Sequence, residues 1–96
     1  MKKIYRIEQE NYFNGSIADL QEYDEAITTL TKILHDEANY NYIANKNNTY
    51  SICEVKIING DEDDYEEEYL DTLINISVKT YRDMSLEEKE KIGLKY

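Results

Sequence analysis

The spacing of the apolar residues between Ile17 and Leu34 constrains the fold of this chain more than any other feature. Within this stretch the apolar side chains recur every three or four positions, which is the spacing of one buried stripe along an α-helix. The stripe consists of Ile17, Leu20, Tyr23, Ile27, Leu30 and Leu34. Just before it, Ser16 and Asp19 resemble a capping box, in which the Ser16 hydroxyl accepts a hydrogen bond from the Asp19 amide. The pattern predicts a helix that begins at Ser16 and ends near His35 to Ala38.

Segments in which apolar and polar residues alternate predict β-strands before and after this helix. The first runs from Lys2 to Gln9, and a turn at Asn14-Gly15 follows it. Tyr40 to Ala44 and Tyr50 to Ile58 predict the two strands of a hairpin, because the asparagine-rich segment between them suits a tight turn. A further half-buried strand is predicted from Ile74 to Tyr81.

The order of the predicted elements indicates the fold class. Near the C-terminus, Ser85 to Glu88 form a second capping-box pattern, and Gly93 is placed to end a short helix. The full order is strand, helix, strand, strand, acidic segment, strand, helix. This order predicts an α+β fold, with one long helix on a mostly antiparallel sheet of about four strands and a short C-terminal helix. A chain of 96 residues supports one core, so residues 1–96 are expected to form a single domain.

The segment from Asn59 to Asp71 carries the strongest functional clue. It reads NGDEDDYEEEYLD and holds eight carboxylates in the eleven residues from Asp61 to Asp71. No basic residue occurs between Lys56 and Lys79, and the formal net charge of the whole chain is −10. Such a charge repels nucleic acid and anionic membranes and attracts basic protein surfaces. The acidic run is therefore a solvated loop, a metal site or a surface that a basic partner recognises.

Ligand spacing argues against a metal site in the acidic run. The EF-hand pattern requires a glycine at its sixth position and a glutamate at its twelfth. A loop that starts at Asp61 has Glu66 and Thr72 at these positions, and a loop that starts at Asn59 has Asp64 in place of the glycine. No dedicated metal site and no cofactor are expected.

Neither the single histidine nor the single cysteine belongs to a catalytic motif. His35 lies near the end of the predicted helix, where its cation would interact favourably with the helix dipole. Cys53 lies on the predicted core face of its strand, and a free cysteine there behaves as a small apolar residue. That face consists of Ser51, Cys53, Val55 and Ile57. The chain also lacks a glycine-rich phosphate loop and a serine elbow, so we expect neither enzyme activity nor a catalytic residue.

Composition also narrows the environment and the partners. Cys53 is the only cysteine, which excludes an internal disulfide and makes a reducing cytoplasm the expected location. The first ten residues, MKKIYRIEQE, lack the apolar core of a signal peptide, and no run of about 18 apolar residues predicts a membrane span. Basic residues are scattered, so neither nucleic acid nor membrane is an expected direct partner.

Tyr65 and Tyr69 interrupt the acidic residues at a spacing of four. On a helix they would lie on one side, where they would either anchor the run to the core or contact a partner. The conformation also decides the charge density of the run. A helix from Asp61 to Asp71 would carry roughly 0.5 negative charge per Å, whereas an extended strand would carry about 0.2. Duplex DNA carries roughly 0.6 per Å, so only a helix would approach the charge density of a duplex.

In size and charge, the chain resembles small phage-type inhibitors of host defence, including anti-CRISPR proteins that occupy the nucleic-acid channel of their target. Its residue usage leans toward A/T-rich codons, which fits a low-GC bacterium or its phage. The resemblance implies an inhibitor, acting in the bacterial host cell, that binds a basic nucleic-acid-binding protein and blocks its nucleic-acid site by charge mimicry. The residues expected to contact this partner are Asp61, Glu62, Asp63, Asp64, Tyr65, Glu66, Glu67, Glu68, Tyr69 and Asp71.

Two other functions are compatible with the same sequence. An immunity protein or antitoxin that neutralises a basic nuclease toxin needs the same electrostatics. An intracellular regulatory or structural subunit would instead use the apolar stripe of a helix or an exposed strand edge, with the acidic residues serving solubility. The sequence leaves the choice among these functions, and the oligomeric state, open.

Overall fold

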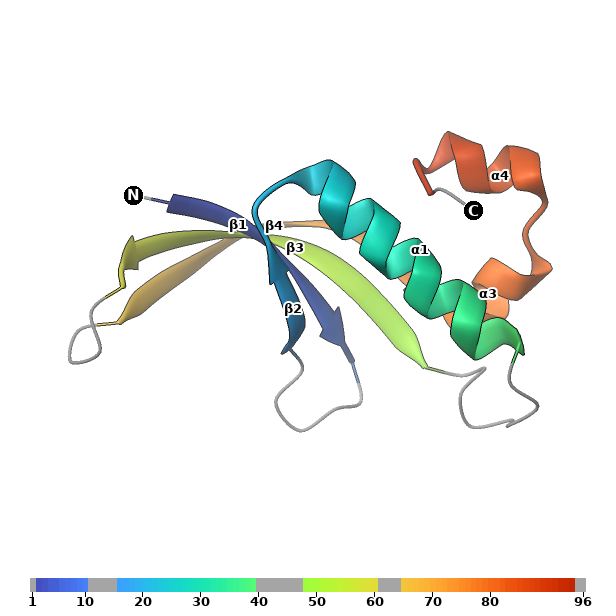
Figure 1. Ribbon diagram of the computed structural model, residues 1–96, viewed down its shortest axis with the longest axis horizontal. Coiled ribbons are helices and arrows are strands. Elements are labelled where there is room, and N and C mark those ends of the chain that lie inside the picture. Colours follow the sequence, from blue (N-terminus) through green and yellow to red (C-terminus); the bar gives the residue numbers. More distant parts are fainter. Residues whose placement is uncertain (1, 11–15, 40–47, 61–64, 95–96) are drawn as a thin grey trace.

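Seven helices and strands follow one another along the part of the chain that the computed structural model describes, residues 2–10, 16–39, 48–60 and 65–94. They are β1 (Lys2–Gln9), β2 (Ser16–Leu20), α1 (Tyr23–Asn39), β3 (Thr49–Asn59), β4 (Glu66–Ser77), α3 (Val78–Asp83) and α4 (Leu86–Lys91). The four strands form one antiparallel sheet in the order β2-β1-β3-β4. Figure 1 shows α1 lying across one face of this sheet, with α3 and α4 on the side toward which α1 runs. The predicted α+β fold is confirmed.

The strands at the centre of the sheet agree with the sequence pattern. β1 and β3 confirm the strands predicted at Lys2 to Gln9 and Tyr50 to Ile58, and the two pair along the whole length of β1. The predicted turn at Asn14-Gly15 and the predicted strand from Tyr40 to Ala44, with most of the turn after it, lie outside the described residues.

The main core lies between α1 and the sheet. Ile27, Leu30 and Leu34 of α1 are buried, which confirms the second half of the predicted helical stripe. They pack against side chains from the sheet and the C-terminal helices, among them Ile7, Tyr50, Ile52, Ile76, Val78 and Tyr81. Tyr23 at the start of α1 packs edge-on against Tyr5, with the ring centroids 5.6 Å apart.

The predicted start of the long helix is wrong, because residues 16–20 form β2 and α1 begins at Tyr23. β2 pairs antiparallel with β1, which places Leu20 opposite Tyr5 and Asp19 opposite Arg6. Ile17, which the helical stripe included, is 44 % exposed. Strand pairing and an ion pair between Arg6 and Asp19 act on this segment, and tertiary contacts of this kind override a local helical pattern.

A second, smaller core lies on the sheet face that turns away from α1. Ile4, Cys53 and Val55 are buried there, and Ile57 packs against them. Side chains of a strand alternate between its two faces, so Ile4 points away from the helix while Tyr5 points toward it. The sheet is therefore packed on both faces.

The prediction for the core face of β3 is only half right. Cys53 and Val55 are buried, as the alternation predicted, but in the second core. The main core under α1 takes Tyr50 and Ile52 from the opposite face of the same strand. The prediction assumed one buried face, whereas a strand that is packed on both sides buries both sets of its side chains.

The last predicted strand ends earlier than the alternation suggested. β4 ends at Ser77, and residues up to Asp83 form α3 instead of continuing the strand to Tyr81. The Ser77 hydroxyl accepts a hydrogen bond from the Thr80 amide and so caps the helix. Val78 and Tyr81, three residues apart, are then buried on one helical face.

The predicted C-terminal capping box is confirmed in α4. Ser85 accepts from the amide of Glu88, and the Glu88 side chain accepts from the amide of Ser85. After the helix, Gly93 adopts φ +87°, a left-handed conformation that suits glycine. The Gly93 amide donates to the Glu90 carbonyl, and the Leu94 amide donates to the Lys89 carbonyl. This turn places Leu94 in the main core.

Candidate functional site

The acidic run is extended wherever the structure describes it. Asp61, Glu62, Asp63 and Asp64 lie outside the described residues, and Tyr65 directly precedes β4. The remaining acidic residues of the run, Glu66, Glu67, Glu68 and Asp71, lie on β4 together with Tyr69. At a rise of about 3.4 Å per residue, residues 66–71 span about 17 Å and carry at most about 0.2 negative charge per Å. The helical alternative, and with it a charge density close to that of a duplex, does not apply to these residues.

Alternation along β4 separates the predicted partner-binding residues into two sets. The first set is Tyr65, Glu67 and Tyr69, and the second set is Glu66, Glu68 and Asp71. Tyr69 pairs with Val55, whose side chain points away from α1, whereas Asp71 pairs with Glu54, which points to the other face. Tyr65 and Tyr69 therefore lie on one face of an extended segment, and the helix on which the spacing of four would have placed them side by side is not formed there.

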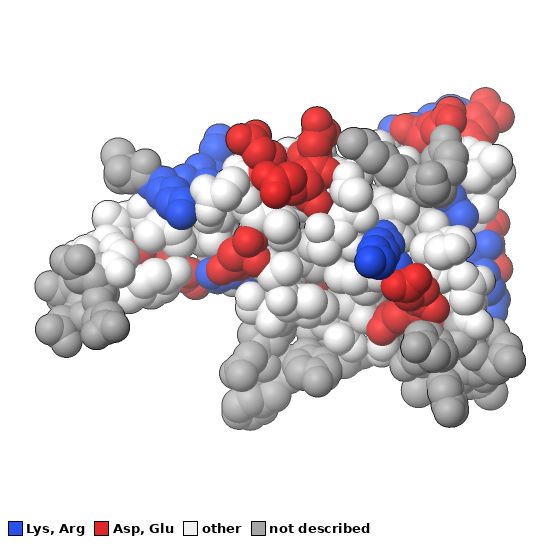
Figure 2. Space-filling view, in the orientation of Figure 1, with Lys and Arg blue, Asp and Glu red and all other residues white. Residues whose placement is uncertain are grey.

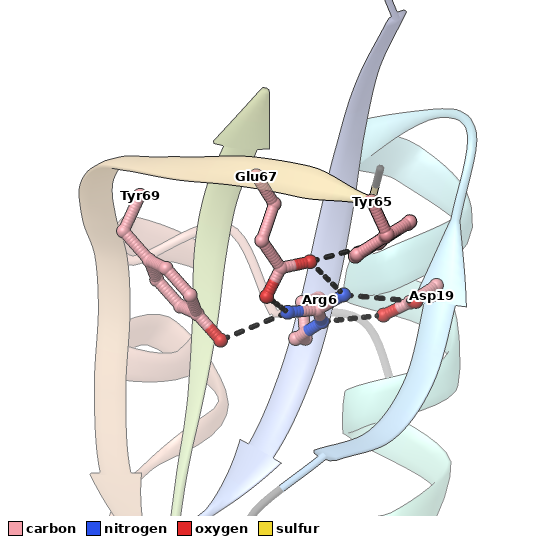
Figure 3. Close-up of polar contacts among 5 residues, drawn as sticks. All are labelled: Arg6, Asp19, Tyr65, Glu67 and Tyr69. Atoms are coloured by element: carbon pink, nitrogen blue, oxygen red, sulfur yellow. Dashed lines mark hydrogen bonds and ion pairs between the residues drawn. The ribbon is translucent and has the colours of Figure 1, made fainter. Parts of the chain in front are cut away.

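Arg6 of β1 lies at the centre of the first set (Figure 3). Its guanidinium makes a two-point contact with Glu67, with Nη1 donating to Oε1 at 2.7 Å and Nη2 to Oε2 at 2.9 Å. It makes another with Asp19, with Nε donating to Oδ1 at 2.8 Å and Nη2 to Oδ2 at 3.2 Å. Nη1 also donates to the Tyr69 hydroxyl at 2.9 Å, and the Tyr65 hydroxyl donates to Glu67 Oε2 at 2.8 Å. We call Arg6, Asp19, Tyr65, Glu67 and Tyr69 the Arg6 cluster.

The Arg6 cluster links two strands that are not neighbours. β3 lies between β1 and β4, and Arg6 pairs with Cys53 whereas Glu67 pairs with Ile57. In a flat sheet Arg6 and Glu67 would therefore be more than two strand spacings, roughly 9 to 10 Å, apart. Figure 3 shows the start of β4 passing over β3 toward β1. This curvature covers the guanidinium, and Arg6 is only 7 % exposed. The first half of β4 is thereby fixed over the second core.

The carboxylates around Arg6 compensate for the burial of its charge. Removing a guanidinium from water costs several kcal/mol, which two bidentate ion pairs offset. The hydrogen bonds that Arg6 donates to Glu67 and, next in size, to Asp19 raise the pKa of Arg6 above its ordinary value, so it stays charged. The hydrogen bond to Arg6 in turn holds the pKa of the Glu67 carboxyl below its ordinary value.

The lowered pKa of Glu67 predicts a specific dependence of stability on pH. Glu67→Gln should lower the free energy of unfolding at neutral pH by about 1 kcal/mol, because it removes one charged partner of Arg6 from a site that keeps some contact with solvent. The folded-state pKa lies below the ordinary value of 4.5, so the carboxylate contributes fully above that value and its contribution is lost as the pH falls through the folded-state pKa. Urea unfolding at a series of pH values should show the two proteins converging in acid. Glu66→Gln is the matched control. A loss of stability in Glu67→Gln that persists in acid would contradict the ion pair with Arg6 as its cause.

Among the described residues, Lys56 of β3 lies in register with Glu68 of the second set. Glu66, Glu68 and Asp71 are exposed and form no ion pair there. Large apolar side chains lie exposed near them in the chain: Tyr65 is 53 % exposed, Leu70 46 % and Leu73 38 %. β4, with Tyr65 directly before it, therefore exposes carboxylates on one face and aromatic side chains on the other. Aromatic residues are enriched in protein interfaces, and polar residues form the rim of such interfaces.

Charge elsewhere on the surface is unevenly distributed. Figure 2 shows acidic side chains gathered near the start of α1, where Asp24 and Glu25 form its first turn, and basic side chains gathered near the start of β1. Lys3 in β1 pairs with Glu54 at 2.7 Å. The start of α1 is thus a further concentration of negative charge besides the acidic residues of β4.

Residues with catalytic or metal-binding chemistry do not converge in the described part of the chain. No group of three or more histidine, cysteine, aspartate or glutamate residues is placed there to hold a metal ion. Cys53 is buried in the second core, where burial raises the pKa of its thiol, while His35 is exposed on α1 against the opposite face of the sheet. None of the described helices combines the length and the hydropathy that crossing a membrane requires.

Comparison of the chain with family models, with curated proteins and with solved structures finds no match.

Arg6 and Asp19 are the residues of the Arg6 cluster that the sequence pattern did not identify as site residues, and Arg6 is the central one. In the sequence it belongs to a small basic group with Lys2 and Lys3. One signal was present, since Arg6 shares the face of its strand with Ile4, and a charged residue in register with buried apolar residues needs a partner. The identity of that partner depended on strand order and curvature.

Proposed function

We propose that this chain is an acidic inhibitor that acts in the bacterial cytoplasm by binding a basic nucleic-acid-binding protein and blocking its nucleic-acid site. The observation that carries the proposal is the set of exposed carboxylates of Glu66, Glu68 and Asp71, which form no ion pair among the described residues. A net charge of −10 adds attraction at longer range, which accelerates the encounter with a basic surface.

The extended conformation of β4 defines how such an inhibitor would compete with nucleic acid. Carboxylates two residues apart on one face of a strand repeat about every 7 Å, whereas duplex DNA carries one charge per about 1.7 Å of its axis. The inhibitor would therefore occupy and neutralise individual lysine and arginine side chains of the partner without matching the charge density of a duplex. Asp61, Glu62, Asp63 and Asp64 directly precede this strand in the sequence and stay part of the proposed contact surface.

The Arg6 cluster indicates different roles for the predicted contact residues. Arg6 already neutralises Glu67, so this carboxylate serves to hold β4 in position. Tyr65 and Tyr69 donate or accept hydrogen bonds inside the cluster, yet 53 % and 50 % of their respective surfaces remain exposed for a partner. In this proposal Glu66, Glu68 and Asp71 attract the partner, and the two tyrosines supply contact area.

Charge reversal on β4 tests the proposal. Immobilised protein is used to capture proteins from a bacterial lysate at low and at high salt, and the captured protein is purified for kinetic measurements. Replacing Glu66, Glu68 and Asp71 with lysine should slow association at least about tenfold and weaken its dependence on salt, because charge steers the encounter. The matched control replaces Glu10, Glu22 and Asp36, which are exposed acidic residues elsewhere, and should change the association rate much less.

Two outcomes would contradict the proposal. One is equal association rates for the β4 reversal and the control reversal. The other is a captured partner that nucleic acid does not displace. The identity of the partner also separates the inhibitor from an immunity protein or antitoxin, because a basic nuclease toxin would indicate the latter.

A further inference from the structure

β4 forms an open edge of the sheet beside the free carboxylates. It is the last strand in the order β2-β1-β3-β4, so one row of its backbone N–H and C=O groups has no strand partner in the described chain. Proteins protect such edges with lysine, proline, short strands or bulges. β4 is 12 residues long and contains neither lysine nor proline.

Bulges limit the part of this edge that is regular. The pairing of β3 with β4 skips Leu70 and Leu73, which are therefore extra residues on β4. A bulge interrupts the regular row of backbone groups on its strand. On β4 itself, residues 66–69 precede the first bulge without interruption, and Tyr65 directly precedes them. We call residues 65–69 the edge segment.

The two faces of the edge segment differ in chemistry. Glu66 and Glu68 project to one face and are free of ion pairs among the described residues. Tyr65 and Tyr69 project to the other face, each about half exposed, and the charge of Glu67 between them is neutralised by Arg6. An added strand with lysine or arginine at alternate positions and apolar residues between them would complement both faces.

A second copy of this chain fits the edge segment poorly. Antiparallel pairing of two edge segments around Glu67 would place Glu66 of each copy directly opposite Glu68 of the other. Like charges directly opposite each other destabilise a strand pair, and each chain carries a net charge of −10. The acidic residues therefore disfavour self-association at this edge while they favour a basic strand.

We propose that the edge segment of β4 docks an extended basic segment of the partner protein, which continues the sheet as a fifth strand. The inference rests on the proposed function and adds the mode of contact. Backbone hydrogen bonds hold the added strand, and its alternate lysine or arginine side chains face Glu66 and Glu68. The tyrosines of the edge segment then pack beside the apolar side chains of the added strand.

Amide hydrogen exchange with two probe peptides tests this mode. The first probe is an eight-residue peptide that alternates lysine with valine, and the second replaces each valine with proline, which keeps the charge and cannot form a strand ladder. At a saturating concentration, the lysine–valine peptide should slow exchange about tenfold at those amides of residues 65–69 that exchange rapidly in the free protein. The lysine–proline peptide should leave these exchange rates unchanged.

The other outcomes separate this inference from the proposed function. Salt-sensitive binding of both peptides without new amide protection would overturn strand addition and leave the charge-based function standing. New protection confined to β2, the other edge of the sheet, would also overturn it. Failure of both peptides to bind would count against strand addition and against the acidic surface of β4 as a contact site.

Discussion

Replacing Arg6 with methionine should lower the free energy of unfolding by about 3 kcal/mol, because the two carboxylates that it neutralises would lose their shared cation in a partly buried site. Glu67 and Asp19 would then face each other across the space that the guanidinium fills. Their side chains are 26 % and 44 % exposed, so water would relieve part of the cost, and the prediction lies at the lower end for a broken buried ion pair. Urea unfolding of the two proteins at neutral pH measures the difference.

A local readout separates the role of Arg6 from a general loss of stability. Cys53 lies in the second core, opposite Arg6 on β1 and Thr72 on β4, and is 6 % exposed. If the Arg6 cluster fixes β4 over this core, Arg6→Met should accelerate the reaction of Cys53 with a thiol reagent by about tenfold under conditions in which the protein stays folded. Arg6→Lys should give an intermediate result, because a lysine cannot make two bidentate contacts. Unchanged labelling together with unchanged stability would show that the cluster does not hold β4.

Replacing Leu30 with alanine should lower the free energy of unfolding by about 3 kcal/mol, because it removes a fully buried side chain from the main core and leaves a cavity. Leu30 has 0 % of its surface exposed and lies in the middle of α1, where alanine itself favours the helix. The loss therefore reports packing of α1 against the sheet. In a domain of this size it should lower the melting temperature by about 15 °C, which thermal unfolding followed by circular dichroism measures.

Leu86→Ala is the matched control for this prediction. Leu86 is 60 % exposed at the start of α4, so the same change of side chain should alter the stability by less than about 0.5 kcal/mol. Equal losses for the two variants would contradict the placement of Leu30 at the centre of the core. A loss confined to Leu30→Ala would support the packing of α1 on the sheet.

The sequence patterns correctly predicted the elements that depend on residues close together in the chain. The stripe from Ile27 to Leu34 became the buried face of α1, and the alternation in β1 and β3 became two central strands. The capping box at Ser85 is present with both of its hydrogen bonds. Each of these features depends on side chains a few residues apart, so the repeat of the backbone is enough to predict it.

The predictions that were wrong concern the ends of elements and the faces of strands. Ile17 and Leu20 satisfy a helical spacing, yet pairing with β1 places residues 16–20 in the sheet. Val78 satisfies a strand alternation, yet Ser77 caps a helix and α3 begins at Val78. In both places the sequence fits the repeat of a helix and also that of a strand, and contacts in the folded protein decide which of the two forms.

The sequence by itself determined the fold class, the long helix, the central strands and the excess of negative charge, because periodicity and composition are properties of the chain alone. Only the tertiary structure decided which acidic side chains remain free. Arg6 and Glu67 are 61 positions apart in the chain, and their contact depends on the strand order and on the curvature that carries β4 over β3. That contact neutralises Glu67 and leaves Glu66 and Glu68 on the opposite face of the strand, since adjacent side chains of a strand point in opposite directions.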